Sequence, residues 1–167
     1  MCSAEIGNQP LPQDMRLIVV GDGPDAADFK ALASSLGCAS RIEFAGYQTG
    51  EALQSYVEGA SLAISSSRWR ENMPYSIVEA FAAGTPVIGT DIGGIPELVD
   101  EGKTGFICEP GGIQSMADAI SRGIHAFLDR SAYSMLQRNC RSYVMENCSR
   151  EKFMNDLVNL YKESIDG

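Results

Sequence analysis

Two carboxylates lie on either side of a predicted helix start. Glu71 belongs to a loop, and Glu79 follows eight positions later, about a turn and a half into a helix that begins near Pro74. Proline is common in the first turn of a helix because its missing N–H needs no partner there. The backbone amides near Met73 to Ile77 are therefore expected to face outward at the positive end of the helix, which is a site for anions such as phosphate.

Carboxylates beside an anion site suit a ligand that carries both phosphate and hydroxyl groups. Hydrogen bonds from hydroxyls to carboxylates are strong and directional. Glu71 is placed to reach sugar hydroxyls beyond a phosphate, and Glu79 is placed to accept from a ribose diol. Each glutamate alone also has an ordinary explanation, Glu71 as an acid that complements the helix dipole and Glu79 as a solvated helix residue.

A glycine-rich turn near the start of the chain is a second candidate. Gly21, Gly23 and Ala26 fit the G-x-G-x-x-(G/A) pattern between a strand and a helix, and Glu43 has about the spacing of a ribose-binding acid. Three interpretations stay open: a plain strand-to-helix turn, a loop close to a bound nucleotide, or the NAD site of an oxidoreductase. Two aspartates in the same turn would face a pyrophosphate, which favours the plain turn.

The elements that must position these residues alternate between strand and helix. After an irregular lead-in over 1–14, apolar strands are expected at 15–20, 41–45, 61–65, 86–90 and 104–108. Helices are expected at 29–36, 50–58 and 74–83, as a short turn near 96, and as C-terminal helices within 113–165. Strands that are apolar throughout are typical of a parallel sheet covered on both faces. The pattern therefore predicts an α/β fold over 15–167, a Rossmann-like doubly wound parallel sheet with helices on both faces.

In such a sheet, ligands bind where the strands end at their carboxyl side. The loops of interest are therefore 21–25, 45–49, 65–74, 91–96 and 109–112.

Bulk composition narrows the classes of protein. The 167 residues, 44% hydrophobic and 21% charged, suit one globular domain, and the net charge of −9 disfavours binding to nucleic acid. Five cysteines without metal-ligand spacing and a single histidine, His125, suggest neither a disulfide framework nor a metal site, and we expect no catalytic role for His125. No apolar run reaches the ~20 residues of a transmembrane helix. We expect no transmembrane segment, no secretion signal and a cytoplasmic location.

The stretch from Glu71 onward resembles a known family. The Glu-X7-Glu spacing, the following segment AFAAGTPVIGT, and the runs GGIPELV and GKTGFI are similar, in the same order, to motifs of the retaining glycosyltransferases of family 4. The resemblance covers roughly Arg16 to Ile120. It implies one half of a two-Rossmann-domain (GT-B) fold, namely the C-terminal domain that binds the donor.

The resemblance implies transfer of a sugar from a nucleotide-diphosphate sugar to an acceptor, with retention of configuration and without a required metal or other cofactor. Glu71 would contact the donor sugar as the catalytic glutamate, Glu79 the ribose, and Gly46 and Tyr47 would lie by the base. Helix amides would stabilise the leaving diphosphate. The expected nucleotide-sugar site takes in the following residues: Gly21, Gly23, Gly46, Tyr47, Asn72, Met73, Pro74, Tyr75, Ser76, Ile77, Glu79, Gly93 and Gly94. For Gly93 and Gly94, close packing beside the site and a simple tight turn are both open.

The sequence also departs from the family. The first strand and helix of the donor domain, with the Arg and Lys that hold the diphosphate, have no counterpart, and neither has the acceptor-binding N-terminal domain. Because the absent strand is central in the usual order, a gap or an exposed strand edge is expected. Arg68 and Arg70 are possible replacements as diphosphate cations, or else ordinary surface charges.

Two functions follow from this mixture of matches and departures. The chain is the donor-binding part of a glycosyltransferase, inactive alone and completed by an acceptor domain in cis or in trans. Alternatively, it is a non-catalytic nucleotide-sugar-binding module or a remnant of such an enzyme. Polysaccharide biosynthesis, with the complete enzyme peripheral at a membrane, is a family-level expectation. An NAD-dependent oxidoreductase would leave the motifs after Glu71 unexplained.

Overall fold

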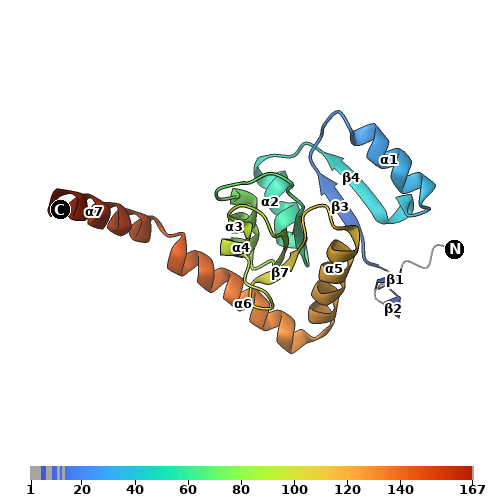
Figure 1. The fold of residues 1–167 in the computed structure, drawn as a ribbon. Helices are drawn as coiled ribbons and strands as arrows, with labels where there is room; N and C mark the ends of the chain where they lie inside the picture. Colours follow the sequence, from blue (N-terminus) through green and yellow to red (C-terminus); the bar gives the residue numbers. More distant parts are fainter. Residues whose placement is uncertain (1–4, 7–8, 11, 13, 167) are drawn as a thin grey trace. The chain divides into compact units, whose positions relative to one another are not determined.

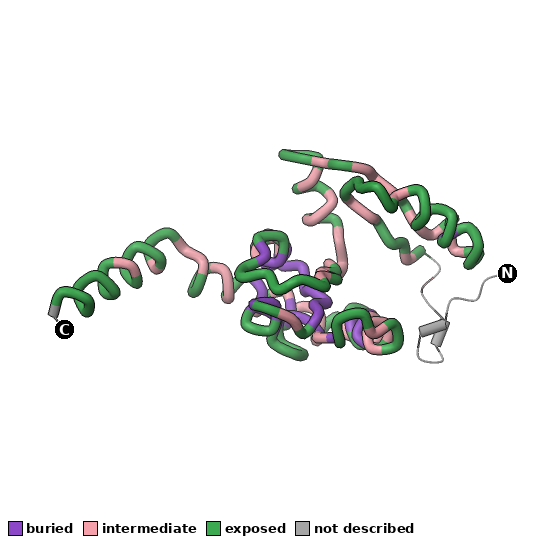
Figure 2. Tube along the Cα trace, turned by 45° about the horizontal axis from the view of Figure 1, so that its top comes forward, coloured by how far each residue is buried: buried purple, intermediate pink, exposed green. Residues whose placement is uncertain are grey.

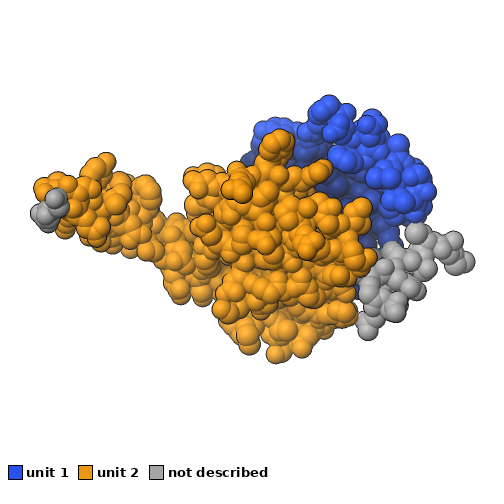
Figure 3. All heavy atoms as spheres, viewed as in Figure 1, with its two compact units in different colours: residues 1–56 blue, residues 57–167 orange. Residues whose placement is uncertain are grey.

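The computed structural model describes residues 5–6, 9–10, 12 and 14–166. The chain divides into two compact units, residues 1–56 and 57–167 (Figure 3). The remaining residues of the lead-in, 1–4, 7–8, 11 and 13, lie outside the described residues, as does residue 167.

The first unit is built on one pair of parallel strands. Strand β3 (Leu17–Val20) pairs with β4 (Ile42–Gly46), with Leu17 opposite Ile42. The helix α1 (Ala26–Ser35) and the 3-10 turn η1 (Ala39–Arg41) connect these strands, and α2 (Gly50–Gly59) follows them. Within the stretch expected to be irregular, β1 (Glu5–Ile6) and β2 (Gln9–Pro10) form a two-residue antiparallel pair.

The second unit contains a three-stranded parallel sheet in the order β5-β6-β7. Its strands are β5 (Ala63–Ser65), β6 (Val87–Thr90) and β7 (Gly105–Cys108). Its helices are α3 (Tyr75–Ala83), α4 (Ile95–Leu98), α5 (Ile113–Leu128), α6 (Arg130–Asn147) and α7 (Arg150–Asp166), as Figure 1 shows. None of the described helices is long and apolar enough to cross a bilayer.

The core of the second unit lies on both faces of its sheet. Val87 joins a cluster with Phe81 of α3 and Ile95 of α4, whereas its neighbour Ile88 joins Phe106 and residues of α5. Side chains of successive strand residues point to opposite faces, so one strand feeds both clusters. The buried residues gather in this unit (Figure 2). Helices therefore cover both faces of the sheet, as the sequence predicts.

The α/β class is confirmed, but the parallel strands do not form one continuous sheet. Among the described residues, β3 pairs only with β4, and β5 pairs only with β6. Each of these two strands therefore keeps an open edge. Leu17 and Ile18 of β3 and Ile64 of β5 remain 41–45% exposed. Every open sheet has such edges, including β4 and β7 here, so the absence of a central strand stays a prediction.

The four described cysteines are free thiols. Cys108 and Cys140 are buried, and Cys38 and Cys148 are partly buried. Burial raises the pKa of the Cys140 thiol to about 12. Cys140 is therefore an inert core residue at neutral pH.

Candidate functional site

The loop that carries Glu71 is tied to the end of strand β6 at two points. The Thr90 hydroxyl donates to the Ser67 carbonyl at 2.7 Å, and the Gly94 N–H donates to the Glu71 carbonyl at 2.8 Å. Thr90 is only 1% exposed, whereas Glu71 is exposed. The loop after β5 and the loop after β6 therefore form one structure at the carboxyl ends of the strands.

The close approach of the two loops requires glycine at two successive positions. A Cβ on Gly93 would lie 2.6 Å from the Glu71 carbonyl oxygen, and Gly93 also has a φ of +59°. A Cβ on Gly94 would overlap the Asn72 carbonyl oxygen. The structure shows both features left open for these glycines, since they form a turn before α4 and also pack closely against the Glu71 loop. Sequence reasoning could not find the partner, because Glu71 and Gly94 lie on different loops.

The helix α3 begins without a side-chain cap. Pro74 occupies the N-cap position, and its carbonyl accepts from the Ile77 N–H at 3.0 Å. The Ile77 N–H is therefore used within the turn and Pro74 has none, so the anion site predicted near Met73 to Ile77 depends on the remaining amides. The amides of Tyr75 and Ser76 have no acceptor within the described residues. These two first-turn donors are open to an anion.

Glu79 shares the exposed face of α3 with the side chains of Tyr75 and Ser76. Tyr75, Ser76 and Glu79 are all exposed, whereas Ile77 and Ala80 between them are buried. Residues three and four apart in a helix share a face. The Glu79 carboxylate therefore lies on the exposed face of the helix whose first turn carries the two open N–H groups.

Two cations lie in the loop cluster, which consists of the loops 66–74, 91–94 and 109–112 that follow β5, β6 and β7. Arg68 and Arg70 are exposed, and neither forms an ion pair with any described acid. The Arg68 Nε lies 4.0 Å from the position that a Cβ on Gly111 would take, so its side chain reaches the loop after β7. The Asp91 N–H, after β6, donates to the Cys108 carbonyl at 2.8 Å. The three loops that follow β5, β6 and β7 therefore converge.

The glycine turn of the first unit uses its amides internally. The Gly21 N–H donates to the Gly46 carbonyl at 2.8 Å, and the Gly23 N–H donates to the Asp22 carboxylate at 2.8 Å. Both loops predicted in this unit, 21–25 and 45–49, therefore meet. Because a dinucleotide site needs these amides for the pyrophosphate, the NAD interpretation loses its donors. Tyr47, next to Gly46, is 77% exposed.

Glu43, the residue at the spacing of a ribose acid, has another partner. Its carboxylate accepts from the Tyr56 hydroxyl at 3.1 Å. This hydrogen bond, together with the negative charge of Glu43, raises the pKa of Tyr56. Glu43 thus links strand β4 to the second half of α2.

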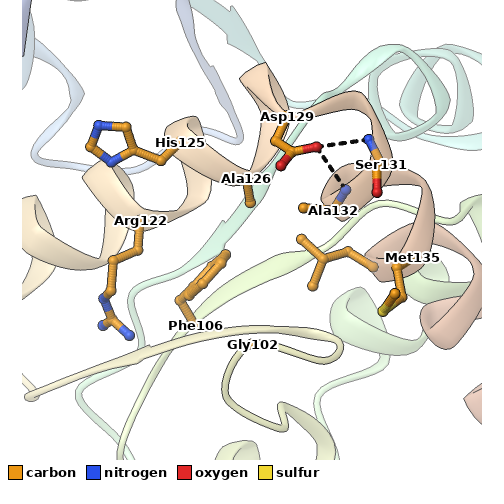
Figure 4. Close-up of a pocket in the computed structure, with 10 residues that line it drawn as sticks. Gly102, Phe106, Arg122, His125, Ala126, Asp129, Ser131, Ala132 and Met135 are labelled. Carbon is orange, nitrogen blue, oxygen red and sulfur yellow. Dashed lines mark hydrogen bonds between the residues drawn. The ribbon is translucent and has the colours of Figure 1, made fainter.

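A pocket that the sequence did not indicate lies between α5 and the start of α6. Its volume is about 540 Å³, and Phe106, Arg122, His125 and Asp129 are among its lining residues (Figure 4). Arg122 pairs with Glu101 and also donates to the Ile107 carbonyl. The Asp129 carboxylate accepts from the Ser131 and Ala132 amides and so caps α6 (Figure 4). Both charged groups therefore stabilise the fold.

This pocket belongs to the opposite end of the sheet from the loop cluster. Gly102, which also lines it, precedes strand β7, and Asp129 follows the last residue of α5. Helix α5 starts after the carboxyl end of β7 and therefore runs back to the amino ends of the strands. His125 lies in this pocket, away from Glu71 and Glu79 along the strand direction.

Parallel strands covered by helices, with converging loops at their carboxyl ends, define a Rossmann-like α/β fold. The chain belongs to the family described as Glycosyl transferases group 1, whose sequence pattern matches residues 5–141.

Individual relatives agree with this membership. The chain is 31% identical over 152 residues to N-acetyl-alpha-D-glucosaminyl L-malate synthase of Bacillus anthracis, covering 91% of this chain and 38% of that protein. The sucrose-phosphate synthase structure from Thermosynechococcus elongatus superposes with a TM-score of 0.74 at 26% identity, over 90% of this chain and 39% of that one. The Anabaena HepE structure in complex with UDP gives a TM-score of 0.77 at 24% identity, over 91% and 42%. The chain thus spans about two fifths of the length of these relatives.

Proposed function

We propose that this chain is the donor-binding part of a retaining glycosyltransferase that uses a nucleotide-diphosphate sugar. The observation that carries the proposal is the loop cluster of the second unit. In this cluster, the loop that carries Glu71 packs against Gly93 and Gly94 and leads into the uncapped start of α3. An uncapped helix start with exposed carboxylates beside it suits a ligand that combines a diphosphate with sugar hydroxyls.

Each group of the cluster has a role in this proposal. The amides of Tyr75 and Ser76 hold a diphosphate oxygen, and Glu79 accepts from the ribose hydroxyls on the same face of α3. Glu71, tied through its carbonyl to Gly94, presents its carboxylate to the donor sugar. As the bond between the sugar and the diphosphate breaks, the fixed amides stabilise the charge that develops on the leaving diphosphate.

The proposed site has few positive charges to neutralise a bound diphosphate. Arg68 and Arg70 are the only Lys or Arg residues in the loops 66–74, 91–94 and 109–112, which also carry Glu71, Asp91 and Glu109. This balance supports the second candidate, a module that binds a nucleotide sugar without transferring it. We expect the isolated chain to bind the donor and to need an acceptor-binding polypeptide for transfer.

Two further features belong to the proposal. No metal is required, because helix amides and guanidinium groups take the place of a cation beside the diphosphate. The cytoplasm is the expected location, with the complete enzyme peripheral at the membrane.

Isothermal titration with UDP, GDP and ADP and with their sugars tests the proposal. We expect one nucleotide to bind, and Glu79→Gln to weaken it about tenfold, since a hydrogen bond to a charged group contributes about 1.5–3 kcal/mol. Glu163→Gln, which removes an equally exposed carboxylate from α7, serves as the matched control and should leave binding unchanged. Absence of binding for every nucleotide would remove the donor-site proposal for this chain.

Dependence on metal is measured in the same titration. The proposed diphosphate partners are amides and guanidinium groups. Addition of about 1 mM EDTA should therefore change the affinity for the nucleotide by no more than a factor of about two. An affinity that falls with EDTA and returns with Mg²⁺ or Mn²⁺ would show that the site needs a cation.

A further inference from the structure

We propose that Thr90 is a positioning residue, whose hydroxyl holds the Glu71 loop in the shape that presents the Glu71 carboxylate to the donor. The inference rests on the proposed function for the role of Glu71. The geometry of the loop itself stands independently of that function. Thr90 contacts the backbone of the loop and no reacting group.

The loop has little else to hold it in place. From 68 to 73 every residue is exposed, including Trp69, whose side chain is 82% exposed. No apolar burial therefore fixes this segment, and loops of this kind open locally at low free energy. Among the described residues, its hydrogen bonds to the rest of the unit are those from Thr90 to Ser67 and from Gly94 to Glu71.

Thr90 is well suited to be the anchor of the two. It is the last residue of β6, its backbone pairs with Cys108 of β7 in register, and its side chain is buried. The position of its hydroxyl is therefore set by the sheet. The hydroxyl donates at 2.7 Å to the carbonyl of Ser67, two residues after strand β5 ends.

Ser67 in turn fixes the backbone of the next residues of the loop through its own side chain. Its hydroxyl accepts from the Trp69 N–H at 3.3 Å and lies 3.2 Å from the Trp69 carbonyl, to which it donates. Such a serine turn fixes the backbone two residues on. The next fixed point is Glu71, whose carbonyl accepts from the Gly94 N–H. The path from Thr90 through Ser67 to Glu71 thus sets where the carboxylate lies.

Thr90→Val tests this role, since valine has nearly the shape of threonine and lacks the hydroxyl. Hydrogen exchange of the Gly94 amide reports directly on its bond to the Glu71 carbonyl. We expect Thr90→Val to speed this exchange about fivefold, in line with one lost hydrogen bond. The Val87 amide, which donates to Thr104 within the sheet, should be unchanged, and Thr90→Ser should behave as the wild type.

Binding gives a second readout. Because Glu71 is placed at the sugar and the α3 amides at the diphosphate, Thr90→Val should weaken a nucleotide sugar about fivefold more than the bare nucleotide. An equal loss for both ligands, or Thr90→Ser behaving as Thr90→Val, would contradict the positioning role. An unchanged exchange rate of the Gly94 amide would also contradict it. The same holds if the exchange rates of the Gly94 and Val87 amides rise together.

The two proposals fail separately. If the wild type binds no nucleotide, the proposed function fails, and the exchange of Gly94 still decides whether Thr90 holds the loop. Ser67→Ala covers the case in which Thr90→Val does not fold, because Ser67 lies in the loop outside the core clusters. It should also speed Gly94 exchange, and an unchanged rate would overturn the path through Ser67.

Discussion

At the scale of single residues, the site depends on two positions that have no side chain, Gly93 and Gly94. Gly93 and Gly94 let the turn after β6 touch the backbone of the Glu71 loop. The motif in the sequence shows only two adjacent glycines. The reason for the second glycine, a carbonyl of Asn72 that leaves no room for a side chain, becomes visible only when both loops are folded.

Gly94→Ala is therefore expected to disturb the site. The new methyl group overlaps the Asn72 carbonyl oxygen, so the Glu71 loop must move, and overpacking of this kind costs about 1–3 kcal/mol. Urea unfolding should show this loss of stability, and titration should show weaker binding of the nucleotide sugar. Gly59→Ala is the matched control, because a Cβ there meets nothing within 4 Å and no positive φ is required. Equal behaviour of the two variants would disprove the close packing.

A buried thiol gives a prediction for alkaline pH. Burial raises the pKa of Cys140 to about 12, whereas the same thiol in the unfolded chain has its ordinary pKa of 9.0. Above pH 9 the unfolded state loses the proton first, so the stability from this group is complete below pH 9 and falls as pH rises toward 12. By pH 10 the loss is about 1 kcal/mol. Cys140→Ala should unfold with a smaller decrease between pH 8 and pH 10 than the wild type, and an equal decrease would contradict the assignment.

At the scale of elements, the sequence predicts the order of strands and helices and the loops that converge. The apolar strands and the helical phase of α5 are local signals, so their positions agree closely with the structure. The loops after β5, β6 and β7 meet as expected for the carboxyl ends of parallel strands. Which amides of α3 stay open could not be predicted, because the Ile77 N–H bonds to Pro74 through the local shape of the turn.

Other parts of the structure depend on contacts between distant segments. The pocket beside His125 forms where α5 and α6 meet the turn at Gly102, and nothing in the sequence marks it. The capping role of Asp129 is different, since an aspartate before a helix is a recognisable start signal. The sequence pattern places the C-terminal helices only within 113–165 and does not assign Asp129 to the start of α6, which begins at Arg130.

The cap of α6 is open to a direct test. The Asp129 carboxylate accepts from two first-turn amides, at 2.9 Å and 3.1 Å. Asp129→Ala should lower the free energy of unfolding by about 1 kcal/mol, whereas Asp129→Ser, which keeps a capping oxygen, should retain most of the stability. Thermal or urea unfolding of the three proteins measures this. A stability for Asp129→Ala equal to that of the wild type would show that the cap contributes nothing.

At the scale of the whole molecule, the described parallel strands form two sheets rather than one. The open edges of β3 and β5 carry apolar residues that are 41–45% exposed, and the chain spans about two fifths of the length of the relatives it matches. The net charge of −9 gives no general attraction for an anionic ligand. Any affinity for a nucleotide diphosphate must therefore arise locally, from the α3 amides and the two arginines.

The most direct test of the central claim follows the backbone amides of α3 by NMR during titration with the nucleotide that binds. We expect the amide resonances of Tyr75 and Ser76 to shift most, together with those of the loop 66–73, and Glu79→Gln to weaken the affinity for the nucleotide. Ligand-induced shifts confined to other parts of the chain, with Tyr75 and Ser76 unmoved, would contradict a diphosphate site at the start of α3.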